Sequence, residues 1–401
     1  MFLHDRIDPN DRFRERRRQA LRRRRIRRAI VVLLVAGIVA AIAGGATYFT
    51  RRGSHSAAAE AAKPGSTVRP KVATSPFRTP APTEIRGVHV TEGLASLPGK
   101  LDGYLGLTKQ GLNTIELDVK DENGYVGFVS AATPALARAT GAARPYYDAK
   151  KFVAKAHRDG VYVIGRVVVF EDPTLTGARP ALGIQSKWGG VWKTSGGLGW
   201  ANEYDPRVWK YNVDVATAAA KAGFDEIQFD YVRFPTDGDI SAMVFPHKRA
   251  EPRSATIDRF FAYAVERLHP LRVRVSADVF GLSASRDLGI GQAPSRIGKV
   301  LDAIYPMVYP SHYNPGEYDL LEPEAFPYAT VVHSLRDFNR QTRGEKVRIV
   351  PWLQDFTIKY SYGLEQVGEQ IDAARTMHAK GFLLWNPSGE YTSNALEHRS
   401  P

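Results

Sequence analysis

The feature that most constrains the fold is a regular alternation of short β-rich runs with helical segments, which begins at Ile85 and continues almost to the end of the chain. Successive βα units of this kind build a parallel sheet. Eight such units over residues 84–392 predict one (β/α)8 (TIM) barrel, with a short tail at 393–401. The expected strands are 85–91, 114–121, 162–170, 226–234, 273–281, 302–310, 347–355 and 381–387.

An open doubly wound sheet is the rival α/β fold. It requires a glycine-rich phosphate turn after its first strand, and HVTEGLASLPGK at 89–100 does not supply one. Helix boundaries support the barrel reading. Asp205-Pro206 predicts an N-cap with proline at the first helical position, and Gly223 closes that helix. The apolar spacing of 364–377 predicts another helix, terminated by Gly381.

The alternation within the strands predicts a polar barrel interior. In the second strand, Glu116, Asp118 and Lys120 share one face, opposite Ile115, Leu117 and Val119. A period of two places the apolar set toward the helices and the polar set toward the axis. Barrel interiors favour bulky apolar residues, so recurring axial charge indicates a site. The alternative interpretation is a buried structural charge network.

Asp230 and Asp278 are the candidate catalytic residues. Asp230 ends the fourth strand in FDEIQFDYVRFP, and Asp278 has the same axial parity in the fifth. Catalytic groups of TIM barrels lie at the C-terminal ends of strands. Paired carboxylates hydrolyse glycosidic bonds without a cofactor, so none is expected. Asp118 is a reserve acid that orients the substrate or tunes its neighbours. The stereochemical outcome, and which acid has which role, stay open.

Polar and aromatic side chains gather near the ends of the same strands, where a sugar would be held. Core packing is the alternative for any single aromatic residue. The predicted cleft lining is Asp118, Lys120, Arg233, Tyr309, His312, Trp352, Gln354 and Trp385. The loop after the third strand adds Trp188, Trp192 and Trp200.

The N-terminal region predicts a membrane anchor. Residues 1–28 contain twelve arginines and four acids, which is +8 of the total formal charge of +13. The uncharged stretch 29–49 reaches roughly 30 Å as a helix, enough to span a bilayer. The arginines before it place the N-terminus in the cytoplasm and the barrel outside. Residues 50–83 read as a flexible Pro/Ala/Ser linker. A cleaved signal peptide and a nucleic-acid-binding arm are the alternatives, and neither is favoured.

Several chemistries lack their sequence signals. The chain has no cysteine, which excludes thiol catalysis, cysteine-bound zinc and disulfides. The ten histidines include no HExxH, and GLSAS at 281–285 lacks the second glycine of a nucleophile elbow. No metal and no nucleic-acid partner is therefore expected.

With these segments assembled, the chain resembles the bacterial putative glycoside hydrolase domain family, whose function is unknown. The matching strings include RGVHVT at 86–91, AGFDEIQFDYVRFPTDG at 222–238, VSADVFGL at 275–282 and VPWLQDF at 350–356. The resemblance covers about residues 84–390 and implies a TIM barrel that acts on a polysaccharide outside the cytoplasm. By position, Asp230 and Asp278 match the acids that similar glycosidases carry on strands four and five.

The sequence therefore predicts a single-pass membrane protein whose extracytoplasmic barrel hydrolyses a cell-envelope or extracellular polysaccharide or oligosaccharide. Two alternatives remain: a non-catalytic glycan-binding barrel and, third, a carbohydrate esterase. The sugar, the linkage and the oligomeric state are not determined by the sequence.

Overall fold

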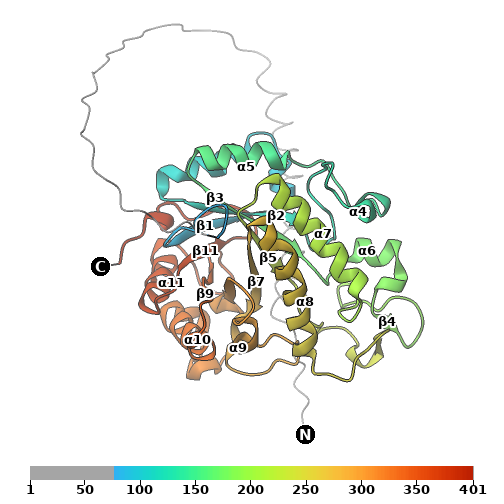
Figure 1. Ribbon diagram of the computed structural model, residues 1–401. Helices are drawn as coiled ribbons and strands as arrows, with labels where there is room; N and C mark the ends of the chain where they lie inside the picture. Colours follow the sequence, from blue (N-terminus) through green and yellow to red (C-terminus); the bar gives the residue numbers. More distant parts are fainter. Residues whose placement is uncertain (1–75, 401) are drawn as a thin grey trace, which may run out of the picture. The chain divides into compact units, whose positions relative to one another are not determined.

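The structure is a computed structural model that describes residues 76–400. Parallel strands form a closed ring in the order β10-β11-β1-β2-β3-β5-β7-β8, because β8 also pairs with β10 (Figure 1). The predicted TIM barrel is confirmed. Its strands are β1 (Ile85–Val90), β2 (Thr114–Lys120), β3 (Tyr162–Val168), β5 (Glu226–Asp230), β7 (Arg274–Phe280), β8 (Ala303–Val308), β9 (Arg348–Ile349), β10 (Trp352–Gln354) and β11 (Gly381–Trp385).

The seventh strand position of the barrel is occupied by two short strands, β9 and β10. β9 pairs with the start of β8, and β10 pairs with the end of β8 and with β11. Pro351 lies between them and has no N–H to donate to a ladder, which accounts for the interruption. β10 still brings Trp352 to the same level as Met307 of β8.

Helices surround the strands, as Figure 1 shows. The predicted caps of α7 (Pro206–Ala222) are confirmed: the Asp205 side chain accepts from the Arg207 N–H, and Gly223 adopts a left-handed φ of 114°. The other helices are α2 (Glu92–Ala95), α3 (Lys100–Leu105), α4 (Ala135–Ala139), α5 (Ala149–Arg158), α6 (Pro173–Ala178), α8 (Arg253–Leu268), α9 (Pro294–Ile297), α10 (Pro327–Gln341) and α11 (Leu364–Thr376).

Gly381 does not terminate α11, which already ends at Thr376. It is instead the first residue of β11, with φ +113°. A Cβ built there would lie 2.1 Å from the carbonyl oxygen of Ile85. Glycine is therefore required by the close approach of β11 to β1.

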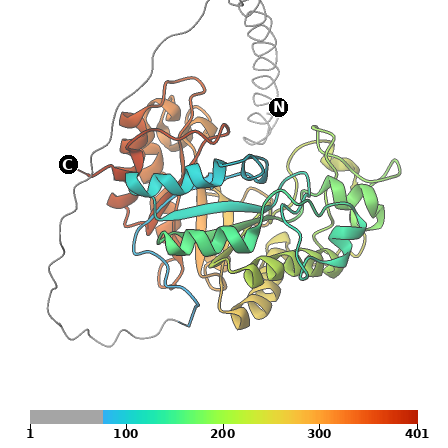
Figure 2. The same ribbon diagram turned by 90° about the horizontal axis from the view of Figure 1, so that it is seen from above.

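The loops after β3 and β5 form a lobe on the side where the barrel strands end (Figures 1 and 2). A two-stranded antiparallel sheet of β4 (Gln185–Ser186) and β6 (Met243–Val244) joins the two loops. Trp192 and Trp200 are buried in this lobe, whereas Trp188 is 79% exposed. Two of these three tryptophans thus pack in the core.

Both ends of the described chain pack against the barrel. Before β1, Arg78 N–H donates to the Arg272 carbonyl and the Thr79 hydroxyl to Asp225. After β11, Ala395 and Leu396 are buried, and Arg375 binds the His398 carbonyl. Residues 76–83 and 395–398, which the sequence places in a linker and a tail, thus contact the domain.

The expected basic tail, membrane helix and most of the linker lie outside the described residues. Within residues 76–400, no helix has both the length and the apolar character needed to cross a bilayer.

Candidate functional site

Asp230 and Asp278 occupy neighbouring strands at the C-terminal end of the barrel, which we call the mouth. The register pairs Phe229 of β5 with Ala277 of β7, so Asp230 and Asp278 follow as the next position. Both side chains have axial parity. Asp278 confirms this for β7, since it binds side chains from β5 and from β10 across the interior.

Asp278 is enclosed by donors on one side only. Its Oδ1 accepts from Gln228 Nε2 and from the Trp352 indole, each at 2.5 Å. Its Oδ2 has no hydrogen-bond partner among the described residues, and Asp278 is 1% exposed. Burial, together with the negative charges of Asp230 and Glu116, raises the pKa of Asp278 well above its ordinary value. This environment favours the protonated form of Asp278 over the charged form.

Asp230 is held by a cation and by its own backbone. Arg166 of β3 donates to its Oδ2 from Nε at 3.0 Å and from Nη2 at 2.7 Å. Its Oδ1 accepts from the N–H of Tyr231 at 2.6 Å. Tyr231 has a φ of 53°, which is rare for a residue other than glycine. Such conformations cost about 1–3 kcal/mol and cluster at functional sites.

Arg166 also links Asp230 to the acids of β2. Its Nη1 lies 2.6 Å from Asp118 Oδ1, and its Nε lies 3.9 Å from Glu116. Opposing charges around this buried guanidinium raise the pKa of Arg166 despite its desolvation. One arginine thus bridges Asp118, the reserve acid of the sequence prediction, and Asp230, one of its two candidate catalytic acids.

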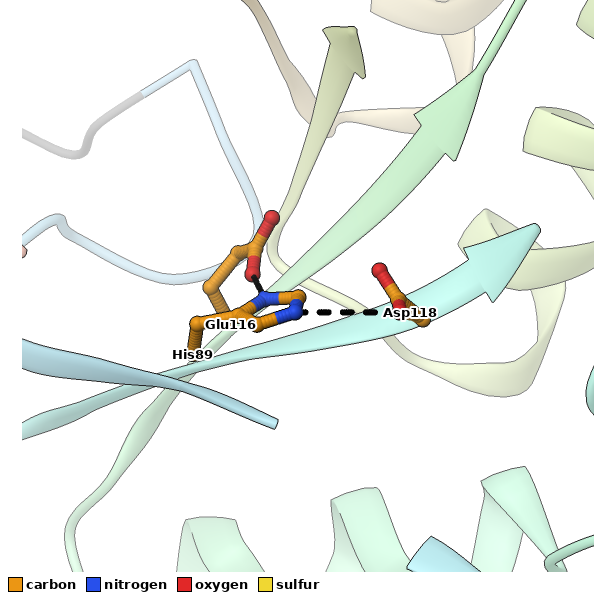
Figure 3. A group of neighbouring side chains, drawn as sticks. All are labelled: His89, Glu116 and Asp118. Atoms are coloured by element: carbon orange, nitrogen blue, oxygen red, sulfur yellow. Dashed lines mark hydrogen bonds and ion pairs between the residues drawn. The ribbon is translucent and has the colours of Figure 1, made fainter. Parts of the chain in front are cut away.

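His89 of β1 lies between two carboxylates of β2 (Figure 3). Its Nδ1 contacts Glu116, and its Nε2 lies 3.7 Å from Asp118. Burial opposes protonation, but Glu116 and Asp118 outweigh it and raise the pKa of His89. The ring also meets Trp352 edge to face, with centroids 6.0 Å apart. A charged network therefore runs from β1 to β5.

His89, Glu116 and Asp118 are the only group among the described residues whose donor atoms converge within 4.8 Å, as a metal site needs. Their neighbours do not suit a cation. Arg166 already places its positive charge 2.6 Å from Asp118, and His89 is engaged with Glu116. These donors are already paired within the protein, so the cluster does not fit a metal ion.

Four rings form an aromatic side of the mouth: Tyr309, His312, Phe356 and Trp385. Tyr309 lies 5.0 Å from Trp385 and 5.2 Å from His312, centroid to centroid, and Phe356 lies 5.2 Å from Trp385. Burial, together with the charges of Asp278 and Asp230, raises the pKa of the Tyr309 phenol well above its ordinary value. His312 and Trp385 are partly exposed.

Two of the predicted lining residues have other contacts. Gln354 is fully buried, where its side chain accepts from Ser311 N–H and donates to the Phe356 carbonyl. Arg233 is 3% exposed and stacks on the rings of Trp200, Tyr231 and Phe280. They support the walls of the mouth and the loops beside it.

Lys120 is not brought into the cluster. The β2–β3 register shifts between Asp118 and Lys120, which breaks the alternation and turns the lysine outward. Its ammonium lies 2.7 Å from Asp172 and donates to Asn212 of α7 at 2.9 Å. It is fully buried. The structure gives it the contacts of a structural ion pair.

Arg166, His89 and Gln228 are site residues that the sequence analysis did not single out. Arg166 is the one charge in the strand YVIGRVV, at axial parity, so its signal was available. His89 was visible only as part of RGVHVT, and Gln228 only through its parity with Asp230. Nothing in the spacing indicates that Gln228 and Trp352 converge on one oxygen.

Comparison with known proteins decides the family. Residues 87–391 match the family described as "Putative glycosyl hydrolase domain". The chain belongs to this family. The match runs from Gly87 in β1 past the end of β11 and includes Asp230 and Asp278. No curated protein matches.

Three solved structures are similar to this chain, and the first two share its fold. The glycoside hydrolase domain of PgaB (BpsB) from Bordetella bronchiseptica is 15% identical, covers 76% of this chain and 95% of its own, and superposes with a TM-score of 0.54. The β-amylase catalytic domain from Paenibacillus polymyxa is 11% identical, with coverages of 80% and 98% and a TM-score of 0.50. A hypothetical protein from Ruminiclostridium thermocellum is 35% identical over 48% of this chain and 97% of its own (TM-score 0.44).

Proposed function

We propose that the barrel is a glycosidase that cleaves a cell-envelope or extracellular polysaccharide with Asp278 as general acid and Asp230 as nucleophile or general base. The observation that carries the proposal is the difference in environment between two adjacent carboxyls. Asp278 is buried with a raised pKa, whereas Asp230 is paired with Arg166. Glycosidases need one protonated and one charged carboxyl beside the scissile bond.

In this reaction the two acids carry out the chemistry, and the aromatic side of the mouth holds the sugar. Asp278 would give a proton from Oδ2, which no described residue hydrogen-bonds, to the departing glycosidic oxygen. Asp230 would attack the anomeric carbon or take a proton from the attacking water. Tyr309 and Trp385 offer ring faces to a sugar. The proposal places the barrel outside the cytoplasm, tethered through residues 29–49.

One observation favours a second candidate, a glycan-binding barrel that does not hydrolyse its ligand. Asp278 is only 1% exposed, and an acid must reach the leaving oxygen to protonate it. A barrel that binds without turnover would keep the aromatic side and need no access to Oδ2. The two candidates differ in whether new reducing ends appear.

The deciding experiment incubates the full-length chain with a panel of envelope glycans and measures new reducing ends and released oligosaccharides. We expect hydrolysis of at least one glycan, and a loss of about 10²-fold or more in both Asp230→Asn and Asp278→Asn. Hydrolysis that survives in both variants would refute the assignment. Binding without any product would establish the second candidate.

Asp355→Asn is a matched control. Asp355 is another buried acid at the end of β10, 3% exposed, but both of its oxygens are engaged by Thr392, at 2.6 and 2.8 Å. It fastens the segment after β11 rather than facing Asp230. Asp355→Asn is expected to lower turnover no more than severalfold. A 10²-fold fall in this variant would mean that replacing any buried carboxyl at the mouth disrupts activity, whether or not it takes part in the reaction.

A further inference from the structure

The end of the barrel opposite the mouth, which we call the base, carries exposed cations around its circumference. The connections that lead from a helix into a barrel strand all lie at this end, because the strands are parallel. Those that precede β2, β3, β5, β8, β9 and β11 hold seven exposed lysines and arginines, none of which forms an ion pair with another described residue. The seven are Lys109, Arg158, Lys221, Lys299, Arg343, Lys346 and Lys380.

Acids at the base are fewer, and the others are engaged. Asp159 and Glu345 are the exposed acids of the same six connections. Asp225, before β5, is buried and lies 2.9 Å from His157. Asp302, before β8, lies 2.8 Å from His269. Seven exposed cations therefore stand against two exposed acids, and the base has a positive excess.

Stabilisation of helix ends does not account for all of these cations. A basic side chain interacts favourably with a helix dipole only within the last turn of the helix. α10 ends at Gln341 and α11 at Thr376, so Lys346 and Lys380 lie beyond that reach. None of the large exposed apolar side chains of the described chain lies in the six connections. The base therefore suits a partner that is bound by charge rather than by apolar contact.

The described chain also begins at the base, and this is a second, independent observation. Arg274 of β7 donates to the Thr79 carbonyl at 2.8 Å. Arg348, at the start of β9, donates to the Pro82 carbonyl at 2.6 Å. Both arginines lie at the starts of their strands, so residues 76–83 are fastened at this end. The preceding chain therefore joins the barrel at the base and not at the mouth.

We propose that the base docks on an anionic lipid surface, with the mouth directed away from the bilayer. Cations spread over six connections suit a broad plane of anionic headgroups better than they suit one small anion, which needs converging donors. A tether that joins the barrel at the base would hold these cations near the headgroups and leave the mouth open to a glycan. This inference goes beyond the proposed function, with which it shares the tether but not the hydrolysis.

The test locates the two ends of the barrel relative to lipid. The chain has no cysteine, so full-length protein with Glu345→Cys takes one donor dye at the base, and Trp188→Cys takes one on the exposed lobe at the mouth end. Each is reconstituted in vesicles that carry an acceptor lipid, made of phosphatidylcholine alone or with phosphatidylglycerol. We expect stronger energy transfer from position 345 than from position 188, only with phosphatidylglycerol, and a fall as salt is added.

A base variant combines Lys221→Gln, Lys299→Gln and Lys380→Gln, which remove three exposed charges without breaking an ion pair among the described residues. The ratio of docked to free barrels, obtained from the energy transfer at position 345, should fall about 10²-fold, at roughly fivefold per charge.

The matched control combines Lys150→Gln, Lys193→Gln and Lys248→Gln. These three lysines are also exposed, but they lie in the first turn of α5 and in the lobe, away from the base. The control removes the same charge and should leave the ratio unchanged.

Equal transfer with both lipids, stronger transfer from position 188, or a ratio that survives in the base variant would each overturn the inference. Transfer that free polyphosphate abolishes, but that phosphatidylglycerol does not raise, would assign the base to a soluble polyanion and would also overturn it. Protein that stays off both kinds of vesicle would overturn the docking and the tether, and the reducing-end assay would still decide the glycosidase proposal.

Discussion

Trp352 of β10 donates its indole N–H to Oδ1 of Asp278 on β7, across the one strand, β8, that separates them. Gln228 donates to the same oxygen from the other side. The two donors fix the orientation of the carboxyl, and its other oxygen, Oδ2, has no hydrogen-bond partner among the described residues. The closed barrel makes this possible, because only there do β5, β7 and β10 face a common interior.

Trp352→Phe tests the influence of this donor on the acid. A hydrogen bond to the charged form lowers a carboxyl's pKa, so its removal should raise the pKa of Asp278 further. A general acid works only while protonated, so activity falls as pH rises through its pKa. We expect the alkaline limb of kcat/KM to move up by about one pH unit, as loss of a charged hydrogen bond implies. An unmoved or lowered alkaline limb would contradict Asp278 as the acid.

Arg166 is the second target, because it is the cation that Asp118 and Asp230 share. Its side chain is 12% exposed. Arg166→Gln leaves buried carboxylates without their partner, which should cost about 3–5 kcal/mol of unfolding free energy. Arg166→Lys keeps the charge but cannot span both acids, so it should fall between parent and Arg166→Gln. Denaturant unfolding measures both.

The control for Arg166 is Arg207→Lys. Arg207 forms an ion pair with Asp205 at 2.6 Å, but its side chain is 61% exposed. Exposed pairs contribute at most about 1 kcal/mol. Equal destabilisation by the two lysine variants would show that Arg166 has no special place in the network.

The eight strands and the axial placement of Asp230 and Asp278 could be predicted because both depend on local pattern. A period of two determines which face of β5 and β7 is axial, and Asp230 and Asp278 follow from it. The place of Lys120 could not be predicted, because one shift of register between Asp118 and Lys120 reverses the face and leaves no mark in the alternation. Periodicity describes a strand, whereas a bulge belongs to a pair of strands.

The network around Arg166 shows a different limit of sequence reasoning. Parity places Arg166 in the interior, but its partners come from β2 and β5. Which charges meet depends on the stagger of the closed barrel, and no single strand contains that information. Axial polarity alone also does not identify the mouth: Glu226 is axial and fully buried, yet it begins β5 and accepts from Tyr162.

Glu92→Gln should change how stability depends on pH. The pKa of Glu92 is raised to about 10 in the folded chain, against about 4.3 unfolded. A raised folded pKa favours the native state below pH 4.3, and that contribution is lost as pH rises toward 10. Glutamine does not titrate. The variant should therefore gain stability relative to the parent between pH 5 and 8, by up to about 4 kcal/mol at 1.36 kcal/mol per unit.

Denaturant unfolding of both chains at pH 5 and pH 8 measures this gain. Glu266→Gln, on the exposed surface of α8, is expected to show none. A Glu92→Gln variant that loses stability relative to the parent on going from pH 5 to pH 8 would mean that Glu92 is charged in the folded state.

Substitutions at Lys120 test whether this residue has a structural role or lines the substrate cleft. Its ammonium is fully buried between Asp172 and α7, so Lys120→Met should cost about 3–5 kcal/mol by leaving Asp172 unpaired. Asp172→Asn keeps an oxygen that accepts from Leu175 N–H at the start of α6. The double variant should therefore recover part of the loss, because no unpaired charge remains. Turnover per folded molecule should stay within about threefold of the parent in both, as expected for contacts remote from the chemistry. A 10²-fold fall in turnover of a fully folded double variant would contradict the structural role and support the predicted role of Lys120 in the substrate cleft.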